Sequence, residues 1–290
     1  MTYNGADLIF PNLGIVIETM QNHITVFGFD IAYYGIIIGI GMLLALFAID
    51  RNVIRHSEDP SIIYDFFIVA IICGILGARI YYVAFEWDNY RGDILKIINI
   101  RQGGLAIYGG ITAGILSALA FSRIRKYPFL KLTDYCMPGV LVGQCVGRWG
   151  NFFNCEAFGG YTESLFAMRM KLSIVNSSMV NDDLLSHLIT DGGVSYIQAH
   201  PTFLYESCWN LLSFLILWFY AGRHKAGTGD VTLRYFILYG TGRFFIESLR
   251  TDSLLIPGTA IAVSQLLSLV LVVVCTAIII YRARSRTKGI

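Results

Sequence analysis

Seven apolar stretches constrain the fold of this chain more than any other feature of its sequence. They occupy residues 29–49, 62–87, 105–122, 132–146, 201–220, 231–249 and 259–281. A membrane-spanning helix needs about 20 mostly apolar residues, and all but the short fourth stretch come close to that length. Charged residues make up only 14% of the chain, against about 25% in a soluble domain. The sequence therefore predicts an all-α integral membrane protein with seven transmembrane helices.

The positions of Lys and Arg predict how these helices are oriented. Cytoplasmic connections of membrane proteins carry an excess of Lys and Arg. The connections on the side opposite the N-terminus hold twelve of these residues, and those on the N-terminal side hold seven. We therefore expect the N-terminus outside and the C-terminus in the cytoplasm. The basic run 282–288 is typical of an anchor beside anionic lipids, and we expect no binding of nucleic acid.

The longest connection, residues 157–199, is polar and lies outside in this topology. We expect it to form a small extracytoplasmic head between helices four and five, inserted into a single membrane domain that spans residues 1–290. The first 28 residues contain no Lys or Arg, so they lack the basic region of a cleavable signal peptide. The first apolar stretch should therefore remain as a transmembrane helix.

A cluster of polar residues stands where the fourth stretch ends, in the run 147–160. Its members are Arg148, Asn151, Asn154 and Glu156. Such groups are costly at the edge of a membrane unless they are paired or functional. On an ideal helix, at about 100° per residue, the four would spread over more than half of the circumference. We expect the helix to end or break near Gly150 and the polar groups to converge on a pocket. The alternative is a helix end with polar caps.

Polar and aromatic residues of six helices share one depth in this topology, toward the outer ends. They are Tyr33 and Tyr34, Arg79, the run 103–110, Arg148, the run 200–206, and Tyr239, Arg243, Glu247 and Arg250. Each has a structural alternative: Arg243 and Glu247 form a buried pair, the glycines are packing points, His200 caps a helix, and the tyrosines belong to an interfacial belt. A common depth of several arginines is better explained by one site.

The chemistry of arginine indicates what such a site would bind. Arginine holds a phosphate bidentately, and the phosphates at this depth belong to phospholipid headgroups. If the site is catalytic, electrostatic stabilisation of a departing phosphate suits it. The six cysteines include no C-x-x-C pair, so neither a zinc site nor a disulfide framework is expected. No nucleotide loop or metal cluster is evident, and we expect no cofactor.

The run 147–159, G-R-W-G-N-F-F-N-C-E-A-F-G, resembles the signature of the bacterial prolipoprotein diacylglyceryl transferases. Matches at 103–110 (G-G-L-A-I-Y-G-G), 200–206 (H-P-T-F-L-Y-E) and 239–247 (Y-G-T-G-R-F-F-I-E) follow in the family's order. The resemblance covers nearly the whole chain. It implies a seven-helix enzyme of the bacterial cytoplasmic membrane with an extracytoplasmic head. Such an enzyme transfers a diacylglyceryl group from phosphatidylglycerol to the lipobox cysteine of a prolipoprotein, giving a thioether and glycerol phosphate.

The same resemblance implies roles for individual residues. It also implies that the protein acts as a monomer whose partners are membrane lipids and the two substrates. Arg148 and Arg243 resemble the arginines that hold the lipid phosphate. The catalytic residues would be Arg148, Arg243, Glu156 and Tyr108. The residues that bind phosphatidylglycerol would be Arg148, Asn151, Asn154, Gly159, Tyr34, Glu247, Tyr239, His200 and Gly104.

Tyr108 departs from the family pattern, because several members have a histidine there that is sometimes proposed as the general base. A free tyrosine titrates near pH 10, roughly three units above neutrality, and is a poor base. Either the base lies elsewhere, or the substrate thiol loses its proton to water or to the departing phosphate. We favour the second, because nearby arginines stabilise a thiolate.

Two other functions remain as alternatives. A lipid-binding transporter or flippase would need a polar path through the cytoplasmic half, where the sequence offers only Asp65, Asp134 and Arg234. The lack of an internal repeat also weighs against inverted-repeat transporters. A structural partner for other membrane proteins would leave the common depth of the arginines unexplained.

Overall fold

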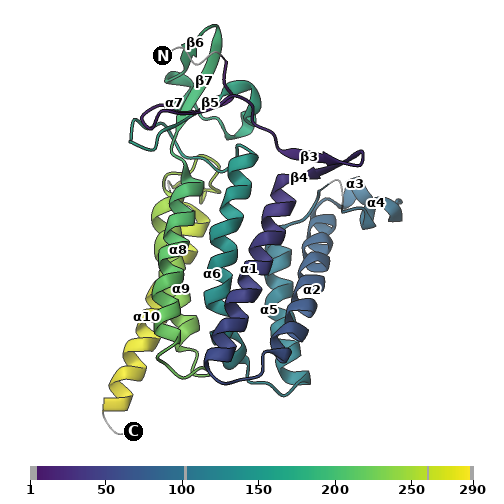
Figure 1. Ribbon diagram of the computed structural model, residues 1–290, viewed down its shortest axis with the longest axis vertical. Helices are drawn as coiled ribbons and strands as arrows, with labels where there is room; N and C mark the ends of the chain where they lie inside the picture. The colour runs from purple at the N-terminus through teal and green to yellow at the C-terminus, as the bar shows by residue number, and fades with distance from the viewer. Residues whose placement is uncertain (1–4, 101–102, 260, 288–290) are drawn as a thin grey trace.

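The chain folds into a bundle of long helices with a small sheet at one end (Figure 1). The structure is a computed structural model that describes residues 5–100, 103–259 and 261–287. Arg101 and Lys288, which contribute to the charge count, lie outside the described residues, as does residue 260 of the seventh stretch. We call the end of the bundle that carries the sheet the head end, and the other end the opposite end.

Seven of the described helices have 18 residues or more. They are α1 (Tyr33–Arg55), α2 (Ser61–Phe85), α5 (Ile107–Ile124), α6 (Phe129–Phe153), α8 (Thr202–Ala221), α9 (Asp230–Glu247) and α10 (Val263–Thr287). Five of them are long and apolar enough to cross a membrane, namely α1, α2, α5, α8 and α10. The other two, α6 and α9, carry Arg148 and Arg243, and their charged residues lower their apolar character. The protein is thus mostly helical and membrane-spanning, as predicted.

Several short elements complete the chain between the long helices. The helices are α3 (Trp87–Tyr90), α4 (Ile94–Ile98) and α7 (Asp182–Ser186), with two 3₁₀ turns at Leu172–Ile174 and Ser177–Met179. The strands are β1 (Leu8–Phe10), β2 (Ile15–Ile17), β3 (His23–Val26), β4 (Phe29–Ala32), β5 (Met168–Lys171), β6 (Ile189–Asp191) and β7 (Val194–Ala199).

The strands depart from the all-α prediction. Five form an antiparallel sheet in the order β2-β1-β5-β7-β6. Three of these come from the expected head insertion 157–199, but β1 and β2 come from the N-terminal segment, which that prediction left out. Sequence alone hides this pairing because each strand has only three to six residues and Leu8 pairs with Met170, far away in the chain.

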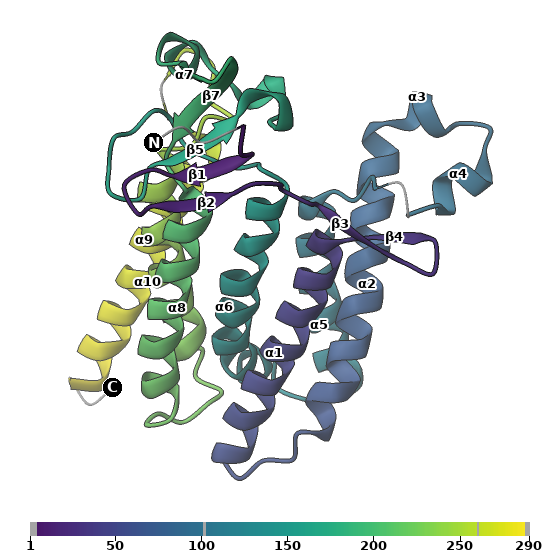
Figure 2. The same cartoon turned by 45° about the horizontal axis from the view of Figure 1, so that its top comes forward.

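The hairpin β3–β4 shifts the start of the first helix. Residues 29–32 belong to the predicted helix, but they pair with residues 23–26 as β4. The turn between the strands consists of Phe27 and Gly28, both at positive φ, which is the turn geometry that two-residue hairpins favour. The hairpin and the short helices α3 and α4 extend from the same side of the head end (Figure 2).

Candidate functional site

Three arginines meet on one buried carboxylate at the head end of the bundle. Glu206, in the first turns of α8, has a side chain only 5% exposed. Its Oε2 lies 2.7 Å from Nη2 of Arg148 on α6, and its Oε1 lies 3.2 Å from Nη1 of Arg243 on α9. Nη1 of Arg250, just after α9, lies 3.5 Å from the same Oε1. These four residues form what we call the arginine cluster, and they tie together three long helices.

Two further carboxylates balance the charge of the cluster. Glu247, which is also buried, lies with its Oε2 2.7 Å from Nη2 of Arg243. Asp252 accepts hydrogen bonds from Nε and Nη2 of Arg250, at 2.9 and 2.7 Å. Burial alone would lower the pKa of Arg250, but the hydrogen bonds and charge of Asp252 outweigh it and raise that pKa. Three guanidinium groups therefore face three carboxylates, which hold one another in place.

The helix that carries Arg148 ends later than the sequence predicts. We expected the helix to end or break near Gly150, and α6 continues without a break for three residues beyond it, to Phe153. Gly150 instead permits a close contact, because a Cβ atom there would lie 2.7 Å from Cδ2 of Tyr34 on α1. The chain turns only after Phe153, where Cys155 and Ala157 both adopt positive φ. That turn, rather than a broken helix, brings the polar groups of the run together.

Glu156 organises the two asparagines of that turn. Its Oε1 accepts hydrogen bonds from Nδ2 of Asn151 at 2.8 Å and from Nδ2 of Asn154 at 3.3 Å. The Oδ1 of Asn151 in turn accepts from Nη1 of Arg148 at 3.5 Å. Asn151 thus connects the carboxylate of Glu156 to the arginine cluster. Glu156 therefore influences the position of Arg148 through Asn151.

Gly159 joins the backbone of three elements next to the cluster. Its N–H donates to the carbonyl of His200 at 2.9 Å, and the N–H of Gly160 donates to the carbonyl of Leu249 at 2.8 Å. A Cβ atom on Gly159 would lie 2.6 Å from that Leu249 oxygen and 2.8 Å from Cβ of His200. Only glycine fits here, and the junction links the turn after α6 to the start of α8 and the end of α9.

His200 and Tyr239 lie close to the cluster residues without making ion pairs to them. Nδ1 of His200 is 3.3 Å from the hydroxyl of Tyr205, and burial lowers the pKa of His200. Tyr239 stacks on Tyr235 and lines a cavity of about 10 Å³ together with Glu206 and Arg243. A space of that size holds at most one water molecule. This cavity is therefore too small to hold a ligand larger than a water molecule.

Three residues that the sequence places at the same depth, Tyr108, Gly104 and Arg79, lie on or next to a different pair of helices, α2 and α5. Tyr108 and Gly104 belong to α5 and the segment before it, and the Tyr108 side chain is 63% exposed. No hydrogen bond joins Tyr108 to the arginine cluster in the described part of the chain. Arg79 on α2 donates to five backbone carbonyls of the segment 96–104, including that of Gly104 at 2.7 Å. Arg79 therefore holds a loop and is not part of the cluster.

Sequence reasoning gave no role to Glu206, Arg250 or Asp252. Glu206 ended a matched run and Arg250 was placed on the polar face of the sixth stretch, but their contact was not foreseen. A signal was available for Glu206, since a carboxylate inside an apolar stretch requires a partner. Asp252 follows the helix and carries no such signal.

The other groups at the site include neither a reactive cysteine nor a metal site among the described residues. Burial raises the pKa of Cys155 to about 11, so its thiol stays protonated near neutral pH. Among the described residues, no group of three or more His, Cys, Asp or Glu side chains is arranged to hold a metal ion. The arrangement offers fixed guanidinium donors and amides, which suit an anionic group.

Comparisons with known proteins agree with this chemistry. The model of the family described as prolipoprotein diacylglyceryl transferase matches residues 21–281. A Listeria monocytogenes serotype 4a (strain HCC23) protein named phosphatidylglycerol–prolipoprotein diacylglyceryl transferase is 42% identical over 253 residues, covering 87% of this chain and 86% of its own. Proteins of that name from Clostridium kluyveri (strain ATCC 8527) and Finegoldia magna (strain ATCC 29328) are 41% and 39% identical. They cover 88% and 86% of this chain, and 93% and 90% of their own.

Proposed function

The chain belongs to the prolipoprotein diacylglyceryl transferase family, and from this premise we propose how its residues carry out the reaction. The enzyme transfers the diacylglyceryl group of phosphatidylglycerol to the lipobox cysteine of a prolipoprotein. The sulfur forms a bond to the glycerol carbon that carries the phosphate. The bond from that carbon to the phosphate oxygen breaks, and glycerol phosphate leaves with the electron pair.

Arg148 and Arg243 hold the lipid phosphate in this proposal. The observation that carries it is their convergence on Glu206, with N–O distances of 2.7 and 3.2 Å. A guanidinium has five N–H donors, and the contacts described above occupy Nη1 and Nη2 of each arginine only in part. The remaining donors are free to take a phosphate on the open side, while Glu206 fixes where both groups point.

The same arginines stabilise the leaving group. As the carbon–oxygen bond breaks, negative charge grows on the phosphate, and donors already in place need no reorganisation to meet it. The charge balance of the cluster prevents permanent tight binding of the product, because three carboxylates already neutralise the arginines. Glu156 and Asn151 are positioning residues that orient Arg148, and Glu247 does the same for Arg243.

The other assigned residues line the headgroup site. Tyr34, Asn154, Gly159, Tyr239 and His200 shape it, and Gly104, whose carbonyl accepts from Arg79, borders it from the helix pair α2 and α5. Tyr108 is a lining residue rather than the base. The proton of the substrate thiol passes to water or to the departing phosphate. The thiol ionises readily because the nearby arginines stabilise the thiolate.

The placement in the membrane is part of the proposal. All seven long helices cross the bilayer, with the N-terminus and the sheet outside and the C-terminus in the cytoplasm. The arginine cluster then lies at the outer leaflet, where a secreted prolipoprotein presents its cysteine. The enzyme acts as a monomer. The excess of Lys and Arg on the opposite side supports this orientation.

The experiment is a transfer assay with purified protein in detergent, phosphatidylglycerol and a lipobox peptide, followed by peptide mass. Wild type should add one diacylglyceryl group. Arg148→Ala should lower the rate by roughly 100-fold or more, the usual loss for a main donor to a developing charge. The matched control is Arg91→Ala, whose guanidinium is exposed far from the cluster.

Tyr108→Phe is the second variant in the same assay, because it removes only the hydroxyl. It should retain most of the transfer rate. An inactive Tyr108→Phe with normal melting would assign the base to Tyr108, against the proposal. A folded wild type that binds phosphatidylglycerol without modifying the peptide would favour a lipid-binding function instead.

A further inference from the structure

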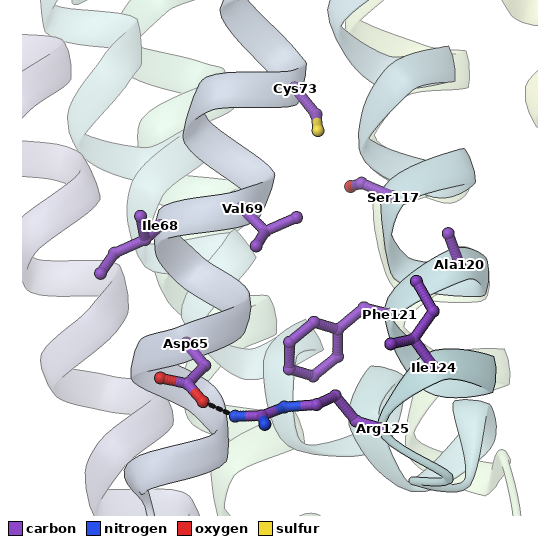
Figure 3. Close-up of a pocket in the computed structure, with 9 residues that line it drawn as sticks. All are labelled: Asp65, Ile68, Val69, Cys73, Ser117, Ala120, Phe121, Ile124 and Arg125. Atoms are coloured by element: carbon purple, nitrogen blue, oxygen red, sulfur yellow. Dashed lines mark hydrogen bonds and ion pairs between the residues drawn. The ribbon is translucent and has the colours of Figure 1, made fainter.

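A groove runs between α2 and α5 at the opposite end of the bundle, away from the arginine cluster. It has a volume of about 470 Å³, within the range of small-molecule sites. Figure 3 shows its apolar walls and the ion pair of Asp65 with Arg125 at one end. Ile68 and Ile124 line it and are 59% and 79% exposed, so the groove opens toward the surroundings of the bundle.

Two features of the helix pair create this groove. Toward the head end α2 and α5 touch, because a Cβ atom on Gly109 would lie 2.4 Å from the carbonyl oxygen of Gly77. Toward the opposite end the side chains of Ser117 and Ala120 are too small to fill the space between the helices. The groove therefore lies in one section of a helix pair that is closed elsewhere.

The polarity and length of the groove match one leaflet. Eight residues separate Arg125 from Ser117, and at about 1.5 Å per residue they span about 12 Å. The hydrocarbon core of a bilayer is about 30 Å thick, so the groove stays within one half of it. Its charged end coincides with the end of α5. In the membrane placement proposed above, on which this inference rests, that end lies at the membrane surface and the other end points to the bilayer centre. A phospholipid has the same orientation in that leaflet.

The charges at the mouth favour an anionic headgroup. Arg125 and Asp65 are both half exposed, so the guanidinium retains open donors beside its carboxylate partner. Arg123 and Lys126 are exposed next to Arg125 in the chain and, although they do not line the groove, add two positive charges to this end of α5. The net charge of these four groups is positive. Basic sites between membrane helices bind anionic lipid headgroups.

We propose that this groove binds one acyl chain of an anionic phospholipid from the leaflet at the opposite end, with its phosphate held by Arg125 and the basic side chains beside it. This lipid is distinct from the substrate, because the groove and the arginine cluster lie at opposite ends of the bundle. The site takes a lipid as a bound ligand and performs no chemistry on it.

The test uses the full chain in bilayer discs of phosphatidylcholine with a small fraction of phosphatidylglycerol that carries a photoreactive acyl chain. After illumination, peptide mass spectrometry locates the labels. We expect labels in residues 65–73 and 117–125. A photoreactive phosphatidylcholine should label them less, by roughly fivefold for each basic side chain that contributes.

Two variants separate the groove from general contact with lipid. Ala120→Phe fills the groove and should abolish its labels, whereas Leu116→Phe, an exposed position outside the lining, should leave them unchanged. Lys126→Asn should reduce the preference for phosphatidylglycerol without altering the groove. Asn suits the positive φ of that position, so this variant tests the proposal even if Ala120→Phe fails to fold.

Equal labelling by the two photoreactive lipids would overturn the proposal, as would labels that survive Ala120→Phe. Transfer measured in the same discs keeps the two hypotheses apart. Ala120→Phe should still transfer diacylglyceryl, and a wild type that fails to transfer would leave the groove labels unaffected.

Discussion

Glu206 is the residue on which the site depends most. Among the residues that the structure describes, it is the carboxylate with the most ion-pair partners, three arginines. A buried carboxylate is stable only when its partners compensate for lost hydration. The arginines depend on it equally, because Arg148 and Arg243 are less than a quarter exposed. The positions of the two arginines that we propose to hold the phosphate therefore follow from one side chain.

Replacing Glu206 by Gln should destabilise the protein by about 3 kcal/mol, the usual loss when one partner of a buried ion pair is removed. The amide keeps the shape of the side chain but leaves three guanidinium groups without their shared counter-charge, and Arg148 then has no carboxylate partner among the described ion pairs. Thermal melting in detergent measures the effect, and the transfer rate should fall as well. The control is Glu163→Gln, an exposed carboxylate on the head. Equal melting temperatures for Glu206→Gln and wild type would contradict this account of the cluster.

His200 should make the stability of the protein depend on pH. Burial lowers its pKa in the folded state below the ordinary value of about 6.5. Between these two pKa values the unfolded chain binds more protons than the folded one, so stability rises with pH there. The melting temperature should therefore fall as the pH decreases from about 6.5, and His200→Gln should reduce this dependence. The exposed His187 provides the comparison, since His187→Gln should retain the slope.

The charges of the site and the pairing of Arg243 with Glu247 were predictable from sequence, but the partner that three arginines share, Glu206, was not. Arg148, Arg243 and Glu247 stand out because charged residues are rare inside apolar stretches. Arg79 stands out in the same way, yet it binds backbone carbonyls of α4 and of the residues just before α5. The distinction depends on where α4 and Gly104 lie against α2, which hydrophobic patterns do not specify. The ion pairs of Glu206 likewise depend on how three helices pack.

At the scale of elements, the junction at Gly159 fixes α8 and α9 against the turn after α6. Gly159→Ala should destabilise the protein by about 1–3 kcal/mol, the usual effect of overpacking. Its Cβ atom would meet the backbone oxygen of Leu249 at 2.6 Å, which cannot rotate away. The neighbouring Gly160→Ala is the control, because the nearest atom to its Cβ is a flexible Asp183 oxygen at 3.7 Å. Similar melting temperatures for both variants would show that the junction can yield.

Helices and strands differed in how far sequence could predict them. The long helices begin or end within a few residues of the predicted stretches, because about 20 apolar residues in a membrane have few alternatives to a helix. The fourth is the exception, since α6 extends to Phe153 through polar residues that its partners satisfy. The strands are short, and the sheet joins the N-terminal segment to residues 168–199. Pairing at such a distance leaves no local pattern.

At the scale of the whole molecule, the two ends of the bundle have different tasks. The head end carries the sheet and the arginine cluster, where the polar side chains satisfy one another. At the opposite end, α2 and α5 pack onto the other helices through a core that includes Ile63, Phe121 and Leu132. That core holds the bundle together away from the chemistry. A lipid bound in the neighbouring groove would support the same end.

This division predicts an orientation that fusion proteins can test. By sequence, twelve Lys and Arg residues fall on the side opposite the N-terminus, against seven on the N-terminal side. This bias should place the opposite end of the bundle in the cytoplasm, because positive segments are retained there. Green fluorescent protein fused after the C-terminus should therefore fluoresce. Alkaline phosphatase, which is active only outside, should be active when inserted at the exposed turn Gly192–Gly193 and inactive in the connection between α8 and α9. The reverse pattern would place the arginine cluster in the cytoplasmic leaflet, out of reach of a secreted prolipoprotein.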